Sequence, residues 1–245
     1  MSDDVVLYES RDRVAIITLN RPDKLNALNG AVCQRMLELW RRFEEGEDRV
    51  AVITGAGRAF TAGADLGDGG EIWPWMPGVG IELKKPVIAA VNGLVVGGGV
   101  VLVQCADMAV IAEDAWLSYP EARIGFTGGL MAGMVARVPH KIAMEFLLVG
   151  EKMTAQRAYE IGFVNRVVPR DEVMDAAMDY ARRIAANAPL VVETLKAFAG
   201  RTMMKSPTEL AGYARQMTER TFESADLQEG LAAFAQKRTP TFRGS

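Results

Sequence analysis

The stretch of sequence that decides the fold is residues 86–125, PVIAAVNGLVVGGGVVLVQCADMAVIAEDAWLSYPEARIG. An apolar, strand-like run ends at Asn92-Gly93, and a triple glycine at 97–99 then leads into a helix-like apolar stretch. Adjacent glycines let the backbone approach a ligand closely, because no Cβ intervenes. At the start of a helix their N–H groups have no intrahelical partner and favour negative charge. The stretch therefore predicts an oxyanion hole, and Glu121 is the nearest candidate acid or base.

Along the chain as a whole, strand-like runs alternate with helical ones, which predicts an α/β fold with parallel strands joined by crossovers. The expected strands are residues 14–19, 50–54, 87–91, 108–111 and 163–168, and an amphipathic helix is expected at 31–45. From Asp171 onward the pattern is helical. One helix is expected to run toward Ala188, the next to begin at Pro189, a third to be capped by Ser206, and the last to span 227–236.

Composition excludes several classes of protein. The 245 residues, 49% hydrophobic and 24% charged, are typical of a globular protein with a sizeable core. A net charge of −3 without a basic block gives no sign of nucleic-acid binding. Cys33 and Cys105, both in apolar surroundings, are interpreted as core residues in a reducing cytosol. With His140 they cannot form a zinc tetrad, so no metal is expected, although carboxylate-based sites stay open.

Residues 86–106 carry no charge and are long enough to span a membrane, for which about 20 apolar residues suffice. Asn92, Gln104 and the glycines interrupt the run, so we expect a buried strand, turn and helix instead of a membrane span. The N-terminal residues 1–12 are acidic and lack the basic start and apolar stretch of a signal peptide. These features favour a cytoplasmic protein.

Several further segments, taken in order along the chain, resemble one family. They are NRP at 20–22, KLNAL at 24–28, GRAFTAGADL at 57–66, AQRAYEIGFVN at 155–165 and GLAAFAQKRTPTF at 230–242. Together with residues 86–125 they resemble the crotonase (enoyl-CoA hydratase/isomerase) superfamily over almost the whole chain. The resemblance implies a crotonase-like ββα spiral core carrying an acyl-CoA site at 1–188. It also implies a C-terminal helical region at 189–245 that assembles a homotrimer or a dimer of trimers.

The resemblance also implies roles for single residues. Ala64 and Gly98 would donate the N–H groups of the oxyanion hole, and Glu121 would transfer protons. The residues implied in binding substrate or CoA are Lys24, Ala27, Ala62, Asp65, Leu66 and Gly97. CoA would enter as part of the thioester substrate, with no other cofactor. Two alternatives stay open: Lys24 as an ordinary surface lysine, and Asp65 as a brace of its loop.

The irregular stretch 67–80, GDGGEIWPWMPGVG, is a loop rich in Gly and Pro that carries Trp73 and Trp75. Two interpretations stand side by side. The loop can fold onto its own core, or these aromatic side chains can form a wall of the acyl pocket.

One departure from the family pattern bears on the reaction. Enoyl-CoA hydratases of the superfamily usually carry two glutamates, but the position of the first is Val101 here, which cannot transfer a proton. A single carboxylate favours Δ3,Δ2-enoyl-CoA isomerisation, because in this respect the chain resembles the isomerases of the superfamily. The alternatives are trans-2-enoyl-CoA hydration and a non-catalytic acyl-CoA-binding protein. The resemblance gives fatty acid β-oxidation as the default pathway.

Overall fold

The computed structural model describes residues 5–245, apart from the side chain of Arg220. Residues 1–4, the start of the acidic N-terminal segment, lie outside the described part. The strands are β1 (Val6–Arg11), β2 (Val14–Leu19), β3 (Val50–Gly55), β4 (Ala59–Thr61), β5 (Val87–Val91), β6 (Leu94–Val96), β7 (Met108–Ala112), β8 (Trp116–Ser118), β9 (Met153–Thr154) and β10 (Arg166–Val168). The α-helices are α1 (Gly30–Glu45), α2 (Gly98–Cys105), α3 (Glu121–Ile124), α4 (His140–Val149), α5 (Ala155–Glu160), α6 (Val173–Ala185), α7 (Pro189–Thr202), α8 (Pro207–Phe222) and α9 (Ala225–Gln236).

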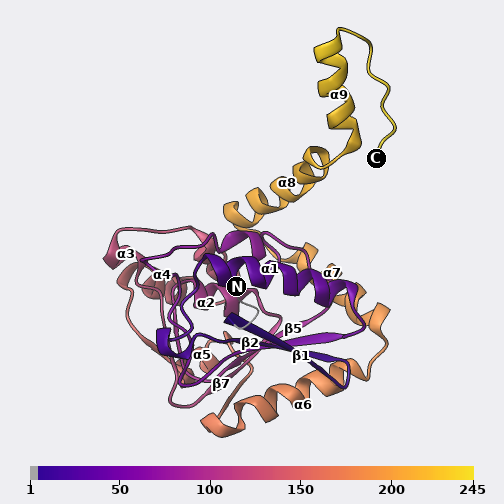
Figure 1. Cartoon of the computed structure of the whole chain (residues 1–245). Coiled ribbons are helices and arrows are strands. Elements are labelled where there is room, and N and C mark those ends of the chain that lie inside the picture. The colour runs from indigo at the N-terminus through magenta and orange to yellow at the C-terminus, as the bar shows by residue number, and fades with distance from the viewer. Residues whose placement is uncertain (1–4) are drawn as a thin grey trace.

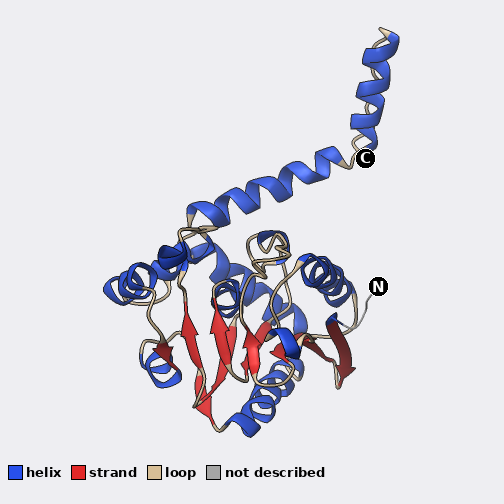
Figure 2. Ribbon diagram, turned by 60° about the vertical axis from the view of Figure 1, so that its left-hand side comes forward, coloured by secondary structure: helices blue, strands red, loops and turns tan. Residues whose placement is uncertain are grey.

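The strands of the described residues form two sheets (Figure 2). The larger has the order β1-β2-β3-β5-β7-β10 and the smaller β4-β6-β8-β9. Successive strand pairs are divided between them: β3, β5 and β7 enter the larger sheet, and β4, β6 and β8, which follow them, enter the smaller one. In both sheets these strands run parallel. The chain therefore advances as a spiral of two-strand units, which confirms the expected α/β, crotonase-like spiral.

The larger sheet is buried because helices cover it. Every residue of β3 and β5 is buried, as expected for parallel strands packed on both faces. Helix α6 packs against β3, β5 and β7 on one side, and α1 lies on the other side (Figure 1). The buried face of α1 carries Met36, Trp40 and Phe43 at helical spacing, and the Asn29 side chain caps the helix by accepting the Val32 N–H at 3.1 Å.

Most expected elements are found within a residue or two of their predicted bounds, but one strand was predicted too long. Of residues 163–168, only Arg166–Val168 pairs with β7. The N–H groups of Phe163 and Val164 instead donate back to the Ala158 carbonyl, at 2.9 and 3.3 Å. The apolar run therefore begins as the close of α5 and becomes a strand afterwards.

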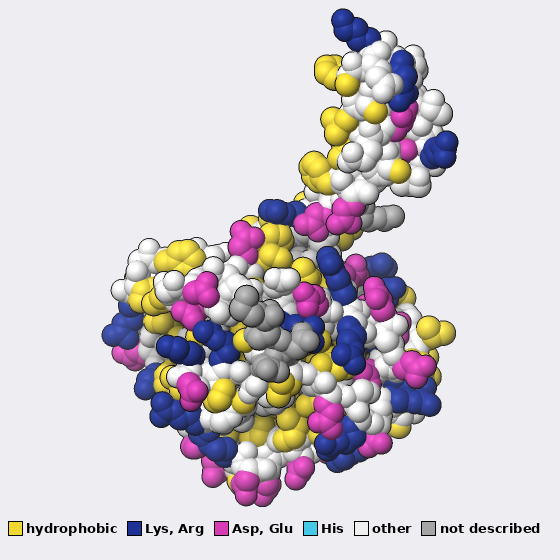
Figure 3. Space-filling model, viewed as in Figure 1, with side chains coloured by type: hydrophobic (Ala, Val, Ile, Leu, Met, Phe, Trp, Pro, Cys, Tyr) yellow, Lys and Arg dark blue, Asp and Glu magenta, His cyan; other side chains and the backbone are white. Residues whose placement is uncertain are grey.

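Helices α8 and α9 project away from the rest of the molecule (Figure 1). Large apolar side chains remain exposed along α7–α9, and Figure 3 shows such side chains along the projecting part. They include Leu190, Leu195, Phe198, Tyr213, Phe222 and Phe234. Exposed apolar surface of this extent is typical of an interaction site. Across residues 5–245 no helix combines the length and the apolar character needed to cross a membrane.

Candidate active site

The triple glycine forms the turn between β6 and α2, and each of its glycines meets a different constraint. Gly97 has φ of +52°, a conformation that other residues rarely adopt. A Cβ on Gly98 would lie 2.6 Å from Ile72 Cδ1, and one on Gly99 would lie 2.4 Å from Thr61 Cγ2. Within residues 5–245 the Gly98 N–H, at the start of α2, has no hydrogen-bond partner. The turn therefore leaves the Gly98 N–H free to donate, at a position where neighbouring side chains leave no room for a Cβ.

A second backbone segment, residues 62–65, packs against this turn. Gly63 has φ of +83°, and a Cβ there would lie 2.5 Å from the Val96 carbonyl oxygen and 3.4 Å from the Gly98 nitrogen. Leu28 holds the segment in place, donating to the Gly63 carbonyl at 2.8 Å and accepting the Asp65 N–H at 3.0 Å. This pairing leaves the Ala64 N–H without a partner in the described part of the chain. The predicted oxyanion donors thus lie on adjoining backbone segments.

Glu121 is the carboxyl group beside these donors. It follows β8 and opens the short helix α3, and its Oε1 lies 3.2 Å from the point where a Cβ of Gly97 would stand. Its Oε2 is buried and has no hydrogen-bond partner among the described residues. Burial, which removes water from the charged form, raises the pKa of Glu121 from 4.5 to about 7, although its own backbone N–H opposes the shift. A carboxyl group with this pKa can both take up and release a proton near neutral pH.

Arg21 braces the 62–65 segment from the N-terminal motif. Its guanidinium donates to Asp65 Oδ2 at 3.1 Å and to the Ala27 carbonyl at 2.6 Å. Asp65 also accepts the Gly67 N–H at 3.2 Å. The hydrogen bond from Arg21, more than any other contact, holds the pKa of Asp65 below its usual value. These contacts favour Asp65 as a brace, one of the two interpretations left open by the sequence.

Asn26, buried with 1% of its surface exposed, ties the same motif to the loop between β3 and β4. Its side chain accepts the Arg21 N–H at 2.9 Å and donates to the Ala56 and Ala59 carbonyls at 2.9 and 2.8 Å. We expect Asn26→Ala to lower the free energy of unfolding by about 3 kcal/mol, because these buried groups lose their partners. Urea denaturation measures the change. The exposed Asn187→Ala serves as control, with an expected effect within about 0.5 kcal/mol; equal losses in both variants would contradict the assignment.

The other predicted binding residues are placed as follows. Ala62 and Gly97 lie in the two backbone segments of the site. The Ala62 N–H donates to the Leu25 carbonyl at 2.9 Å, and the Gly97 N–H donates to the Ser118 carbonyl at 3.0 Å. Lys24 is exposed, and Leu66 is 88% exposed at the start of the irregular loop. The structure brings Ala62, Ala64, Gly97, Gly98 and Glu121 together. CoA contacts by Lys24, Ala27 and Leu66 stay predictions.

The side chains of the 67–80 loop have different surroundings, and one of them, Ile72, was not singled out by the sequence. Trp75 is fully buried in the core, which favours a loop folded onto its own core for this side chain. Trp73 is half-buried beneath the Arg215 guanidinium, 4.7 Å from its ring centre, and its pocket role stays a prediction. Ile72 is the side chain that lies against Gly98. Nothing in the sequence distinguishes Ile72 from the other apolar residues of this Gly-rich loop.

No second acid occupies the position expected for hydratases. Val101 lies in the first turns of α2 and is 1% exposed. Within residues 5–245 there is also no group of three or more His, Cys, Asp or Glu side chains that could hold a metal ion. Glu121 is therefore the carboxyl group that the structure places at the glycine turn.

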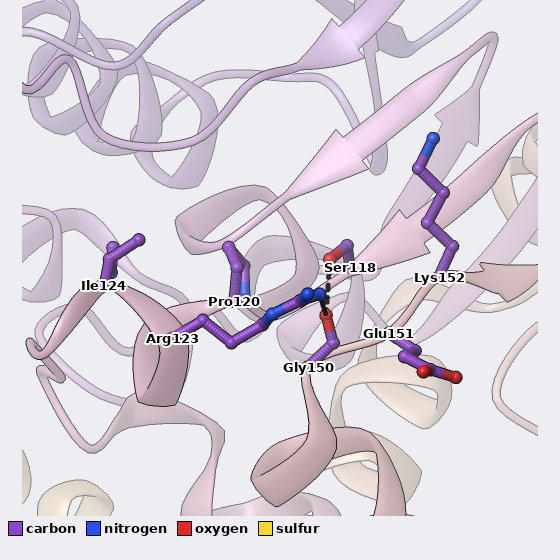
Figure 4. Close-up of a pocket in the computed structure, with 7 residues that line it drawn as sticks. All are labelled: Ser118, Pro120, Arg123, Ile124, Gly150, Glu151 and Lys152. Atoms are coloured by element: carbon purple, nitrogen blue, oxygen red, sulfur yellow. Dashed lines mark hydrogen bonds between the residues drawn. The ribbon is translucent and has the colours of Figure 1, made fainter.

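A surface hollow of about 650 Å³ lies between residues 118–124 and residues 150–152 (Figure 4). Its lining includes Ser118, Arg123 and Lys152. Arg123 reaches the Gly150 carbonyl at 3.5 Å, and Ser118 reaches the same oxygen at 3.4 Å. Glu121 is directed toward Gly97 and is not among the residues that line the hollow.

Free backbone donors beside a carboxyl group of raised pKa, at the turns of a ββα spiral, define the class of crotonase-fold enzymes. Comparison with known proteins agrees. Residues 9–73 and 80–245 match the family described as Enoyl-CoA hydratase/isomerase. The chain belongs to this family of enzymes.

Individual relatives align over nearly their whole length. A carnitinyl-CoA dehydratase of Proteus mirabilis is 39% identical, over 96% of this chain and 97% of the relative. Enoyl-CoA hydratase EchA19 of Mycobacterium tuberculosis is 34% identical, over 97% and 96%. Among solved structures, an enoyl-CoA hydratase of Mycobacterium marinum aligns with a TM-score of 0.77 at 35% identity, over 99% of this chain and 100% of that one.

Proposed function

We propose that this enzyme is a Δ3,Δ2-enoyl-CoA isomerase that uses one carboxyl group. Glu121 takes a proton from C2 of a 3-enoyl thioester, and the electrons of that C–H bond move onto the thioester oxygen to give a dienolate. The N–H groups of Ala64 and Gly98 donate to this oxygen. Glu121 then returns the proton to C4, which leaves the double bond between C2 and C3. The observation that carries the proposal is the lone carboxyl of Glu121 facing the glycine turn, with Val101 buried at the position where hydratases carry their first glutamate.

The energetics favour such a mechanism. A proton next to a thioester carbonyl is weakly acidic, so the barrier falls only if the developing oxyanion is stabilised. Preorganised N–H donors do this without reorganisation, and each contributes about 3 kcal/mol in comparable sites. A pKa of about 7 lets Glu121 act as base in the first step and as acid in the second.

Hydration of a trans-2-enoyl thioester is the second candidate. It is supported by the names of the relatives, which include hydratases and a dehydratase. In this reaction Glu121 would have to orient and activate the water without a second glutamate. A non-catalytic acyl-CoA-binding role is the remaining alternative.

The ultraviolet absorbance of the conjugated enoyl thioester distinguishes these functions. Purified protein is mixed with a 3-enoyl-CoA in one cuvette and with the trans-2-enoyl-CoA in another. A rise in the first with little change in the second is the expected result. A fall in the second that depends on Glu121 would replace isomerisation by hydration, and no change in either would contradict both activities on these substrates.

The pH dependence of the reaction follows from the environment of Glu121. Its carboxylate form is the base, so kcat/KM is expected to rise about tenfold per pH unit below a pKa of about 7 and to level off above it. Initial rates between pH 5 and 9 at low substrate concentration measure this limb. A limb near 4.5, the ordinary pKa of a glutamate, would show that Glu121 is solvated in the working enzyme.

The proposal extends to assembly and setting. The exposed apolar side chains of α7–α9 support a homotrimer or a dimer of trimers formed through residues 189–245, with residues 1–188 as the catalytic core. Light scattering after gel filtration tests this, with an expected mass of three or six times the 26.6 kDa of the chain. Fatty acid β-oxidation in the cytoplasm is the setting proposed from the family resemblance.

A further inference from the structure

The first turn of α8 is anchored to the core by an ion pair between buried Glu209 and half-buried Arg137. Arg137 donates to Glu209 at 2.7 Å, and Glu209 is only 3% exposed. The second Glu209 oxygen accepts the Ser206 N–H at 2.8 Å, which completes a capping box. Arg137 also donates to the Gly133 carbonyl at 2.7 Å, and a Cβ on Gly133 would lie 2.8 Å from the Glu209 carboxylate. The pair is thus enclosed on several sides.

Hydrogen bonds continue from this anchor to the segment that carries Glu121. The Thr208 hydroxyl donates to the Gly129 carbonyl at 3.1 Å, and the Gly129 N–H donates to the Thr127 hydroxyl at 3.0 Å. The Thr127 hydroxyl in turn lies 3.3 Å from that of Tyr119, two residues before Glu121. Hydrogen bonds therefore connect α8 to Tyr119, and the backbone of two residues connects Tyr119 to the proton-transfer group.

The same anchor reaches the oxyanion side of the site. Gln104, near the end of α2, donates to the Leu130 carbonyl at 3.2 Å. Helix α2 begins at Gly98, the proposed donor. Residues 127–137 are thus held between α8, the Glu121 segment and the helix of the oxyanion hole.

Residues 122–128, which follow Glu121, are exposed, although α3 also contacts α4. Ile124 and Phe126 are 54% and 67% exposed. Gly125 and Gly129, at φ of +76° and +70°, flank the exposed turn. A segment with so few buried apolar contacts depends on its hydrogen bonds for a fixed position.

We propose that Glu209 and Arg137 are positioning residues, which act through residues 119–137 to hold Glu121 against Gly97. The proposal rests on the proposed function only in taking Glu121 as the proton-transfer group. If the anchor is loosened, water reaches the Glu121 carboxyl and its ionised form becomes easier to make. The proton-transfer step then slows, while binding of the CoA portion, which lies elsewhere in the proposal, is retained.

The titratable groups near Glu121 and near the Glu209–Arg137 pair determine how a change in the pKa of Glu121 can be interpreted. Tyr119 is the titratable side chain beside it; burial raises the pKa of Tyr119, the Thr127 hydroxyl lowers it, and the Glu121 charge adds to the increase. The Glu209 carboxylate stays charged, because the Ser206 N–H and Arg137 outweigh the opposing effect of burial and hold its pKa below the usual value. Burial raises the pKa of the neighbouring Cys105 thiol to about 12. The charges of Arg137 and Lys205 oppose this increase, and those of Glu209 and Asp107 add to it.

The test compares full-length Glu209→Gln with a matched control in the same helix, Glu219→Gln, which removes an exposed ion pair to Arg215. The infrared band of the protonated Glu121 carboxyl, assigned by its loss in Glu121→Gln, is titrated in each protein. In Glu209→Gln the midpoint is expected to fall by about one pH unit from about 7, toward the value of a solvated glutamate. We expect kcat to fall about tenfold and KM to change less than about twofold. Glu219→Gln is expected to match the unchanged protein.

Thr208→Val is a milder second variant, which leaves the ion pair intact and removes only the hydrogen bond to Gly129. It is expected to move the midpoint in the same direction by a smaller amount, and it decides the matter if Glu209→Gln does not fold. Lower thermal stability with an unchanged midpoint and unchanged kcat would overturn the proposal. The infrared midpoint needs no turnover, so it judges the anchor even if the unchanged protein proves inactive on 3-enoyl-CoA.

Discussion

Replacement of Glu121 by glutamine is expected to lower kcat by about 10²–10⁴-fold, the usual contribution of a general acid–base group. Glutamine keeps the shape of the side chain but cannot accept and return a proton. Its neutral amide also suits the buried site, so binding of the thioester should be retained. Steady-state kinetics on the 3-enoyl-CoA, together with direct binding of the product, measure both quantities.

A matched control separates this loss from a general effect of changing a glutamate. Glu113 lies in an exposed turn between β7 and β8, and Glu113→Gln should keep the original kcat. The Glu121→Gln variant should also be more stable than the unchanged protein above pH 7. Burial raises the pKa of Glu121 above 4.5, so the folded state binds more protons than the unfolded state between 4.5 and about 7, and stability falls as pH rises through that range. Turnover by Glu121→Gln near the original rate would contradict the assignment of Glu121.

Substitution of Gly63 by alanine is expected to lower kcat by about 10²–10³-fold, the effect of losing one oxyanion donor. The new Cβ would lie 2.5 Å from the Val96 carbonyl oxygen, which belongs to the backbone and cannot rotate away. The 62–65 segment must shift, and the Ala64 N–H moves with it. The kinetic assay is accompanied by thermal denaturation, because the clash also destabilises the fold.

Gly78→Ala is the control for backbone strain. Gly78 has φ of +73°, close to that of Gly63, but a Cβ there meets nothing within 4 Å. Both variants adopt a left-handed conformation that costs about 1–2 kcal/mol for alanine. Only Gly63→Ala adds the contact with the backbone of the site. Equal activity in the two variants would show that the clash does not reach the donor.

The larger sheet could be predicted from the sequence because its strands are long, apolar runs with clear stops. β2 and β5 have the predicted bounds, and α1 begins one residue before its own predicted start. The smaller sheet could not be predicted in the same way. β4, β6 and β8 are three residues each, too short for any periodicity to show, and they are defined by their partners in the spiral.

The candidate site divides along similar lines. Gly98, Ala64 and Glu121 lie in motifs that are contiguous in sequence, so their types and spacing could be recognised. Arg21, Ile72 and Glu209 belong to the surroundings of the site only through tertiary contacts. The predicted strand at 163–168 failed because hydrogen bonding by Phe163 depends on where α5 ends, which apolarity alone does not indicate.

The contact between Ile72 and Gly98 bears on how an enzyme of this kind can diversify. The glycine turn is crowded at every position, so it tolerates little change. Ile72 comes from an irregular loop whose own backbone takes no part in either sheet. Reaction chemistry and the surface beside it are thus encoded in separate stretches of the gene. Substitutions at Ile72 can therefore change that surface without altering the glycine turn that carries the proposed oxyanion donor.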